Sequence, residues 1–256
     1  MRINNAISFA VICPVYNSEK YIAQTLESVL QQTLLPKEII IVDDGSNDGT
    51  LEIIHEVEHK WNVTISIIKS SHKGPGAARN LGVIRSNSDW IAFIDSDDLW
   101  KKNKLETISK SIVSHPLKNI FCHAEDHLNL NGSIKSINYG KSYDYSKKLS
   151  SQLFLRNYFS TSAVVCKKEL ILKFGGFDEN MMNAQDYDLW LKISPDCSPL
   201  FLSNILGVYR IRNGSITSGS INNKTINLLK IFMRYKSYVT IRQLFLKMMR
   251  IIASYF

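Results

Sequence analysis

The chain has 256 residues, 45% apolar and 21% charged, which is typical of a soluble globular protein with one large α/β domain or two small ones. Its four cysteines form no CxxC pair, which argues against a zinc site or a disulfide framework and fits a reducing compartment. No uninterrupted apolar stretch reaches the roughly 18 residues of a membrane span. We interpret the first apolar run, residues 6–13, as a strand and not as a secretory leader, because no small-residue cleavage site follows it.

The net charge of +8 is concentrated at one end of the chain. Residues 221–256 contain seven Lys and Arg and no Asp or Glu, so the remaining residues are nearly neutral. The apolar residues of this basic tail recur at helical spacing. It is either a helix packed on the rest of the protein or an interfacial helix on anionic lipid, and the charge favours the second. Nucleic acid is not expected as a partner, because no recognised binding module accompanies the charge.

The first hundred residues alternate between short apolar runs and amphipathic segments. The expected strands are 7–15, 38–42, 63–68 and 90–94, and the expected helices are 19–32, 50–59 and 74–86. Ser18 is the expected N-cap of the first helix. Strands that alternate with helices form parallel sheets with right-handed crossovers, so this half predicts an open α/β sheet.

The pattern after Trp100 is less regular. We expect helices at 101–114, 149–157, 169–174 and 183–193, strands at 121–124, 162–166 and 206–211, and a hairpin or loop at 129–148. Gly175 and Gly176 are expected to close the helix at 169–174, and Asn183 to cap the helix that follows. Residues 213–223 are rich in Gly, Ser and Asn and indicate a linker.

An acidic cluster follows the strand expected at 90–94. Asp95, Asp97 and Asp98 lie within four positions, at the strand end where open α/β sheets bind their ligands. Carboxylates this close repel one another unless a cation lies among them. The chain has neither GxGxxG after its first strand nor GxxxxGK[ST], so phosphate must be held in another way. The cluster therefore predicts a divalent metal that binds substrate phosphates, although a solvated, helix-capping turn is the simpler alternative for such a motif alone.

Seven motifs in this order and spacing resemble those of family 2 glycosyltransferases, which have a GT-A fold. They are CPVYN at 13–17, VDDGS at 42–46, GAARNLG at 76–82, DSDD at 95–98, GGFD at 175–178, QDYDLW at 185–190, and YR at 209–210 with GS at 214–215. The resemblance covers about the first 220 residues and excludes the basic tail. It implies a GT-A domain at 1–220, with a nucleotide-binding half at 1–100 and an acceptor half at 101–220. The basic helical tail at 221–256 is expected from its apolar spacing and charge instead.

The resemblance also implies site residues. Around the base and ribose of a nucleotide-sugar donor it places Pro14, Tyr16, Asn17, Asp43 and Asp44. Asp95, with Ser96 and Asp97, would hold ribose and a Mn²⁺ or Mg²⁺ ion bound to the diphosphate, and Asp186 would be the general base. Arg79 is as consistent with a surface ion pair as with a donor contact. Such a metal stabilises charge on the leaving phosphate without proton transfer.

Two positions depart from the family pattern. Gln185 stands where the family commonly has Glu, so one carboxylate near the acceptor is missing. Arg212 stands where a His is frequent, and we expect it to contact the diphosphate in its place.

We therefore predict an inverting, metal-dependent transferase that moves a sugar from a nucleotide-sugar to a hydroxyl acceptor. The expected donor is a UDP-sugar. A lipid-linked or polysaccharide glycan, at the inner face of a bacterial cytoplasmic membrane, suits the basic tail. The alternatives are a nucleotidyltransferase, which should carry a glycine-rich basic loop after the first strand, and a non-catalytic nucleotide-sugar-binding protein. The sequence leaves a homodimer open.

Overall fold

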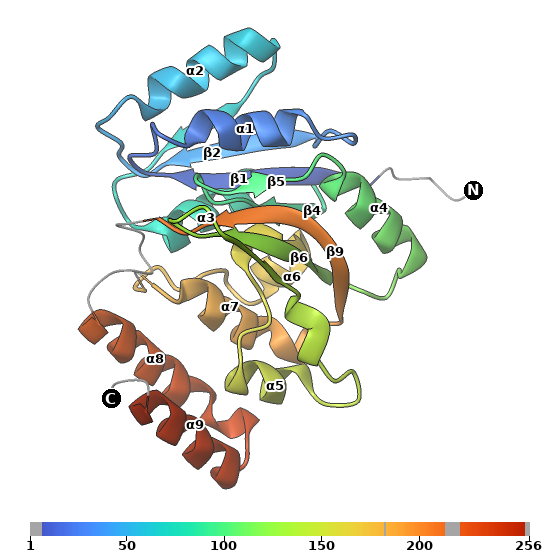
Figure 1. The fold of residues 1–256 in the computed structure, drawn as a ribbon, viewed down its shortest axis with the longest axis vertical. Coiled ribbons are helices and arrows are strands. Elements are labelled where there is room, and N and C mark those ends of the chain that lie inside the picture. The colour runs from blue at the N-terminus through green and yellow to red at the C-terminus, as the bar shows by residue number, and fades with distance from the viewer. Residues whose placement is uncertain (1–6, 182, 213–220, 254–256) are drawn as a thin grey trace.

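The computed structural model describes residues 7–181, 183–212 and 221–253. Figure 1 shows one α/β body with a pair of C-terminal helices packed against it. The strands are β1 (Phe9–Val15), β2 (Glu38–Asp43), β3 (Ser66–Lys69), β4 (Trp90–Phe93), β5 (Leu99–Trp100), β6 (Ile120–Leu128), β7 (Ile134–Ile137), β8 (Val164–Lys167) and β9 (Pro199–Arg210). The helices are α1 (Ile22–Leu30), α2 (Thr50–Trp61), α3 (Pro75–Arg85), α4 (Lys104–Ser114), α5 (Leu149–Leu155), α6 (Lys168–Lys173), α7 (Gln185–Ile193), α8 (Ile221–Tyr235) and α9 (Ile241–Ala253).

All the strands of the described residues join one sheet in the order β3-β2-β1-β4-β8-β6-β9-β5, with β7 paired to β6. The first four strands in that order are parallel, as the βαβ pattern predicts. Strand β8 is antiparallel to both of its neighbours, and β6 and β9 are parallel to each other. The sheet is therefore mostly parallel, and the carboxyl ends of β1, β2 and β4 meet at one edge.

The sheet is buried on both faces. Alternate residues of β1 illustrate this, because Ala10 and Ile12 belong to one core and Phe9, Val11 and Cys13 to the other. Helices α1, α2 and α4 cover the second face, whereas α5, α7 and α8 cover the first (Figure 1). Helix α3 also packs closely, since a Cβ on Gly82 would lie 2.6 Å from the Ile12 side chain.

Strand β9 is longer than expected, because the sequence indicates a strand only at 206–211. The polar pair Ser203-Asn204 interrupts the apolar pattern and suggests a break. In the structure this pair lies at a register shift, where His123 pairs with Leu202 and Ala124 with Ile205. The strand thus continues past a bulge, a feature that apolar periodicity does not detect.

Two of the expected helix caps are wrong. Helix α1 begins at Ile22, and the Ser18 hydroxyl instead shares a 2.7 Å hydrogen bond with Ser96. Helix α7 is preceded by Ala184 in the left-handed region at φ 56°, without a side-chain cap. The side chain of Asn183 accepts a bond from Asn227 of α8. The expected helix closure by Gly175 and Gly176 is confirmed, since both have positive φ and their N–H groups bond carbonyls of α6.

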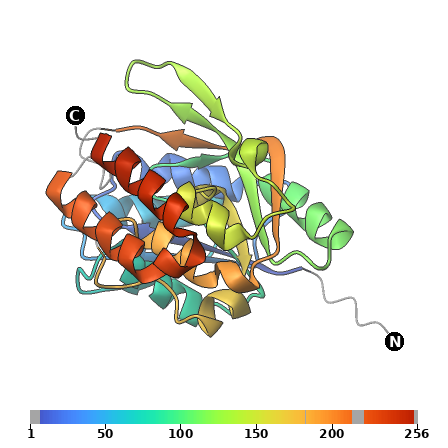
Figure 2. The ribbon, with the colours of Figure 1, turned by 90° about the horizontal axis from the view of Figure 1, so that it is seen from below.

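The basic tail forms α8 and α9, joined by a 3-10 turn at Lys236–Tyr238. Figures 1 and 2 show the two helices side by side on the body. Residues 221–223 of the expected linker belong to α8, and 213–220 lie outside the described residues. No helix within the described ranges is both long enough and apolar enough to cross a bilayer.

Candidate functional site

The loops after β1, β2 and β4 meet at the carboxyl edge of the sheet. Hydrogen bonds tie the first two loops together, from Asn17 N–H to Ser46 Oγ (3.0 Å) and from Asn47 N–H to Asn17 Oδ1 (2.9 Å). Asn17 adopts φ 48°, a left-handed conformation that asparagine tolerates better than most residues. The Ser18–Ser96 bond ties the first loop to the acidic loop. One continuous surface therefore carries all three of these sequence motifs.

The carboxylates of Asp43 and Asp44 are buried and accept hydrogen bonds from backbone N–H groups. Asp44 accepts the N–H of Lys73 at 2.9 Å and that of Gly74 at 2.7 Å, at the start of α3. Asp43 accepts the N–H of Ser46 at 3.0 Å. Both side chains therefore shape the expected nucleoside site, and a direct contact with the nucleoside stays a prediction.

An aromatic pair lies beside this loop. The rings of Tyr16 and His72 are 4.4 Å apart between centroids, and Tyr16 is 45% exposed. His72 adopts φ 54° and its ring nitrogen lies 3.0 Å from the carbonyl oxygen of Asp44. No sequence motif selects His72, because the turn that brings it to Tyr16 is not a recognised pattern. Exposed aromatic faces of this kind can stack on a nucleobase.

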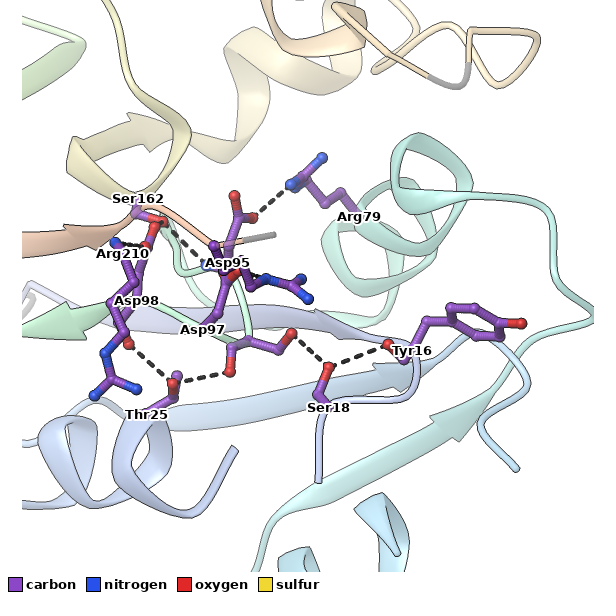
Figure 3. Close-up of polar contacts among 11 residues, drawn as sticks. Tyr16, Ser18, Thr25, Arg79, Asp95, Asp97, Asp98, Ser162 and Arg210 are labelled. Atoms are coloured by element: carbon purple, nitrogen blue, oxygen red, sulfur yellow. Dashed lines mark hydrogen bonds and ion pairs between the residues drawn. The ribbon is translucent and has the colours of Figure 1, made fainter. Parts of the chain in front are cut away.

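The acidic loop faces two arginines. Figure 3 shows Asp95 directed at Arg79, whose Nη2 lies 2.5 Å from Asp95 Oδ1. Asp97 is bonded in the same way by Nε of Arg212. Arg79 is only 5% exposed, and its Nε and Nη1 have no hydrogen-bond partner among the described residues. A buried guanidinium with unpaired donors beside a carboxylate is suited to bind an anion.

Asp98 has a different position from its neighbours. It is 1% exposed, and its carboxylate accepts the Ser162 hydroxyl at 2.5 Å and the Arg210 N–H at 3.0 Å (Figure 3). Burial, followed by the charges of Asp95 and Asp97, raises the pKa of this carboxyl well above its usual range. Asp98 caps no helix, since α4 begins only at Lys104. It fastens the acidic loop to β9 and to the turn before β8.

The carboxylates of the acidic loop suit a metal ion whose remaining ligands are phosphate oxygens and waters. Within the described ranges no three His, Cys, Asp or Glu side chains converge as a metal cage. Asp95 and Asp97 are close enough for Asp95 to raise the pKa of Asp97, after burial as the larger cause. Mg²⁺ and Mn²⁺ commonly take one or two carboxylates, with phosphates and waters as the remaining ligands. The donor set therefore fits a phosphate-bound cation.

Asp186 lies in the first turn of α7, on the other core face from α1. Its Oδ2 accepts the Thr161 hydroxyl at 3.3 Å. Burial raises its pKa, Arg79 opposes this effect, and the charge of Asp95 adds to it. Thr161, which bonds Asp186, is next to Ser162, which accepts the backbone N–H of Asp95, so Asp186 lies close to the acidic loop. The adjacent Gln185 is buried, and its Oε1 has no partner among the described residues.

The structure thus brings most of the expected residues to one place. Pro14 is buried near the end of β1, and Ser96 is a buried residue of the acidic loop. Arg212 reaches the loop from beyond β9. Sequence reasoning missed Ser18 and Ser162, which act through contacts with residues 78 and 67 positions away.

Comparison with known proteins agrees with this geometry. The profile described as glycosyl transferase family 2 matches residues 10–168, more than half of the chain. The chain belongs to this family. Residues 10–168 include the loops after β1, β2 and β4 but exclude Asp186, so the match does not test the proposed base.

Curated relatives are mostly longer than this member of the family. An uncharacterised glycosyltransferase of Rickettsia conorii is 31% identical over 90% of the chain, and the chain spans 37% of that protein. The poly(ribitol-phosphate) β-N-acetylglucosaminyltransferase TarS of Staphylococcus aureus is 38% identical over 43% of the chain and 19% of its own length. An uncharacterised glycosyltransferase of Haemophilus influenzae is 26% identical, over 84% of the chain and 73% of its own length.

Solved structures support the fold. A crystal structure of S. aureus TarS residues 1–349 with UDP-GlcNAc superposes with a TM-score of 0.74, at 24% identity over 91% of the chain and 66% of that structure. The Pyrobaculum calidifontis mannosyltransferase with GDP-Man and Mn²⁺ superposes with a TM-score of 0.67 at 18% identity. That match covers 88% of this chain and 63% of the mannosyltransferase structure. The predicted GT-A-like architecture is confirmed.

Proposed function

We propose that the protein transfers a sugar from a nucleotide-sugar donor to a hydroxyl acceptor, with inversion at the anomeric carbon. The observation that carries this proposal is the convergence of Asp95, Asp97, Arg79 and Asp186 at the carboxyl edge of the sheet. Two acidic side chains with flanking guanidinium groups suit the metal-bound diphosphate. A separate, partly buried carboxylate suits the acceptor. UDP is the proposed nucleotide, because the TarS structure contains UDP-GlcNAc.

Each charged group has a distinct task in this proposal. Asp95 and Asp97 hold a Mn²⁺ or Mg²⁺ ion, which when bound stabilises negative charge on the leaving diphosphate. Arg79 and Arg212 bind the same anion and keep the two carboxylates in place when the cation is absent. Asp186 accepts the proton of the attacking hydroxyl. Burial raises its pKa, which makes its carboxylate a stronger base than that of an exposed aspartate.

The proposed acceptor is a glycan or a lipid-linked polymer of the bacterial surface, used at the cytoplasmic face of the membrane. Two relatives are named for work on such polymers, the poly(ribitol-phosphate) β-N-acetylglucosaminyltransferase TarS and the minor teichoic acid biosynthesis protein GgaA of Bacillus subtilis. The second is 36% identical over 48% of this chain. The basic composition of residues 221–256 is consistent with a location near anionic lipid.

A thermal-denaturation screen of nucleotide sugars tests this proposal. A donor that binds the native state raises the melting temperature, and we expect the largest rise with a UDP-sugar plus Mn²⁺. EDTA or Asp97→Asn should remove most of the rise, whereas Asp186→Asn should retain it but abolish sugar transfer. A rise that is indifferent to EDTA would overturn the metal site. Transfer by Asp186→Asn at the wild-type rate would exclude Asp186 as the base.

A further inference from the structure

Helices α8 and α9 have one face on the body and one face in solvent. Figure 2 looks onto the end of the molecule where these helices lie beside α5. On the inner face, Ile231, Phe232 and Tyr235 of α8 are buried in the core that also contains α7. In α9, Leu244 packs against the same core, and Nζ of Lys247 donates to the carbonyl oxygen of Leu155 in α5.

Polar bonds fix the rotation of α8 about its axis. Arg234 donates to the buried carboxylate of Asp188 at 2.6 Å and to Asp178 at 2.9 Å. The Tyr235 hydroxyl lies 3.0 Å from the same Asp188 oxygen, and Asn227 bonds Asn183. With its inner face held in this way, the opposite face of α8 is directed away from the protein.

That opposite face is apolar. Among the side chains of α8 and α9 whose burial is described, the exposed large apolar ones are Ile226, Leu229 and Met233 in α8 and Ile241, Phe245 and Met249 in α9; each is 49 to 86% exposed. The spacings of three and four residues put each set on one stripe of its helix. Two neighbouring helices thus each expose a stripe of large apolar side chains to water, and such exposed apolar surface commonly marks an interaction site.

Positive charge borders the two stripes. Lys230 of α8, Lys236 of the turn that follows it and Arg242 of α9 are exposed, and residues 221–256 contain no acidic side chain. The charge continues onto the body next to the turn between α8 and α9. There a cavity of about 610 Å³ is lined by Lys118, Lys147 and Lys148 together with Ser237 and Tyr238. Of these lysines, Lys147 is paired with Asp144 at 2.9 Å.

We propose that the solvent faces of α8 and α9 dock on an anionic lipid bilayer, with the two apolar stripes inserted at the level of the headgroups and the cations against the lipid phosphates. Apolar side chains flanked by Lys and Arg, without acidic residues, are what such a surface binds. A second copy of this chain is a poorer partner for the same face, because it would oppose one basic tail with another. This docking does not depend on the donor or on transfer.

Flotation of the full chain with vesicles tests the proposal. One set of vesicles contains phosphatidylcholine alone, and the other contains phosphatidylcholine and phosphatidylglycerol in equal amounts. We expect binding to the second set only, weakened by high salt. The variant Leu229→Ser/Met233→Ser/Phe245→Ser should bind at least about tenfold more weakly. The matched control Val113→Ser/Leu117→Ser changes exposed apolar residues near the end of α4 and should bind like the wild type.

Three further measurements make the result decisive. Melting temperatures should be close for all these proteins, since every substituted side chain is exposed. The charge variant Lys230→Gln/Lys236→Gln/Arg242→Gln should lose the preference for phosphatidylglycerol. Equal flotation of the triple serine variant and the wild type would overturn the proposal. The proposal would also be overturned if the wild type floated with neither vesicle and formed a dimer, whereas the triple serine variant was a monomer.

Discussion

The hydroxyl of Ser162 accepts the backbone N–H of Asp95 at 3.0 Å and donates to the buried carboxylate of Asp98 at 2.5 Å. A single side chain from the turn before β8 thus holds both ends of the acidic loop. We expect Ser162→Ala to lower the free energy of unfolding by about 1–3 kcal/mol, because it leaves a buried acceptor without its donor. The same substitution should also reduce the rise in melting temperature that the nucleotide-sugar donor causes. Urea unfolding and donor-induced melting shifts measure the two effects.

The matched control for this substitution is Ser203→Ala, which changes an exposed serine at the bulge of β9. It should alter the free energy of unfolding by less than about 0.5 kcal/mol. If the two variants have equal stability and bind the donor equally well, Ser162 does not anchor the loop.

Titration of Asp186 should determine how the transfer rate falls on the acidic side of the pH–rate profile. As the proposed base it must be ionised, and because burial raises its pKa, activity should fall with decreasing pH at a higher pH than for an ordinary aspartate, whose pKa is about 3.9. Asp186→Asn should lower kcat by about 10²- to 10⁴-fold, the contribution typical of a general base. Because a raised pKa makes the ionised form costly in the folded protein, the Asn variant should be no less stable at neutral pH.

Glu179→Gln is the control for Asp186, since it removes a nearby carboxylate while keeping an oxygen that can accept from Asn80. This variant should retain turnover and its pH profile. Loss of activity in Glu179→Gln, with activity kept in Asp186→Asn, would move the role of base to Glu179.

Lys104 should make stability depend on pH on the alkaline side. Its ammonium group is buried, lies 3.7 Å from the centroid of the Trp100 ring and donates to the Ser162 carbonyl oxygen at 2.6 Å. Burial lowers its pKa to about 7, against the opposing effects of Glu125, Cys122 and Asp98. The unfolded chain keeps this proton up to about pH 10.4, so Lys104 makes stability rise between those two values.

Lys104→Met should therefore remove part of this rise. The difference in unfolding free energy between wild type and variant should change by up to about 1.4 kcal/mol per pH unit from pH 7 to 10. Urea titrations at a series of pH values give this difference directly. Parallel curves over that range would show that Lys104 has an ordinary pKa in the folded protein.

Arg234 should stabilise the contact between α8 and α7. Arg234→Gln leaves the carboxylate of Asp188, which is fully buried, with the Tyr235 hydroxyl and without a counter-ion. We expect a loss of about 2–4 kcal/mol, since removing one partner of a buried pair is costly. Lys230→Gln removes one positive charge from an exposed position of the same helix and should cost less than about 0.5 kcal/mol. Equal melting temperatures of these two variants would contradict the packing of the tail on the body.

The sequence predicted most of the features that depend on residues close together in the chain. Short continuous apolar runs located β1, β2 and β4, and the abrupt change to Asp95 located the acidic loop. The roles of Ser18 and Asn183 were wrong because a capping residue type says nothing about a competing partner from a distant segment, Ser96 or Asn227. The ion pairs of Arg79 and Arg212 likewise require knowledge of the whole fold. The sequence left two options for the basic tail, and only the three-dimensional contacts show that its inner face is packed.

The contacts between the acidic loop and β9 also have a consequence for synthesis of the protein. Asp97 is bonded to a residue 115 positions later in the chain, and Asp98 to one 112 positions later. A nascent chain can fold its N-terminal βαβ units early, but these two carboxylates lack the bonds to Arg210 and Arg212 until β9 and Arg212 have left the ribosome. Closing such long loops is entropically expensive. Completion of the acidic loop is therefore a late event in folding, and ribosome-arrested chains ending before and after β9 should differ in their ability to bind the donor.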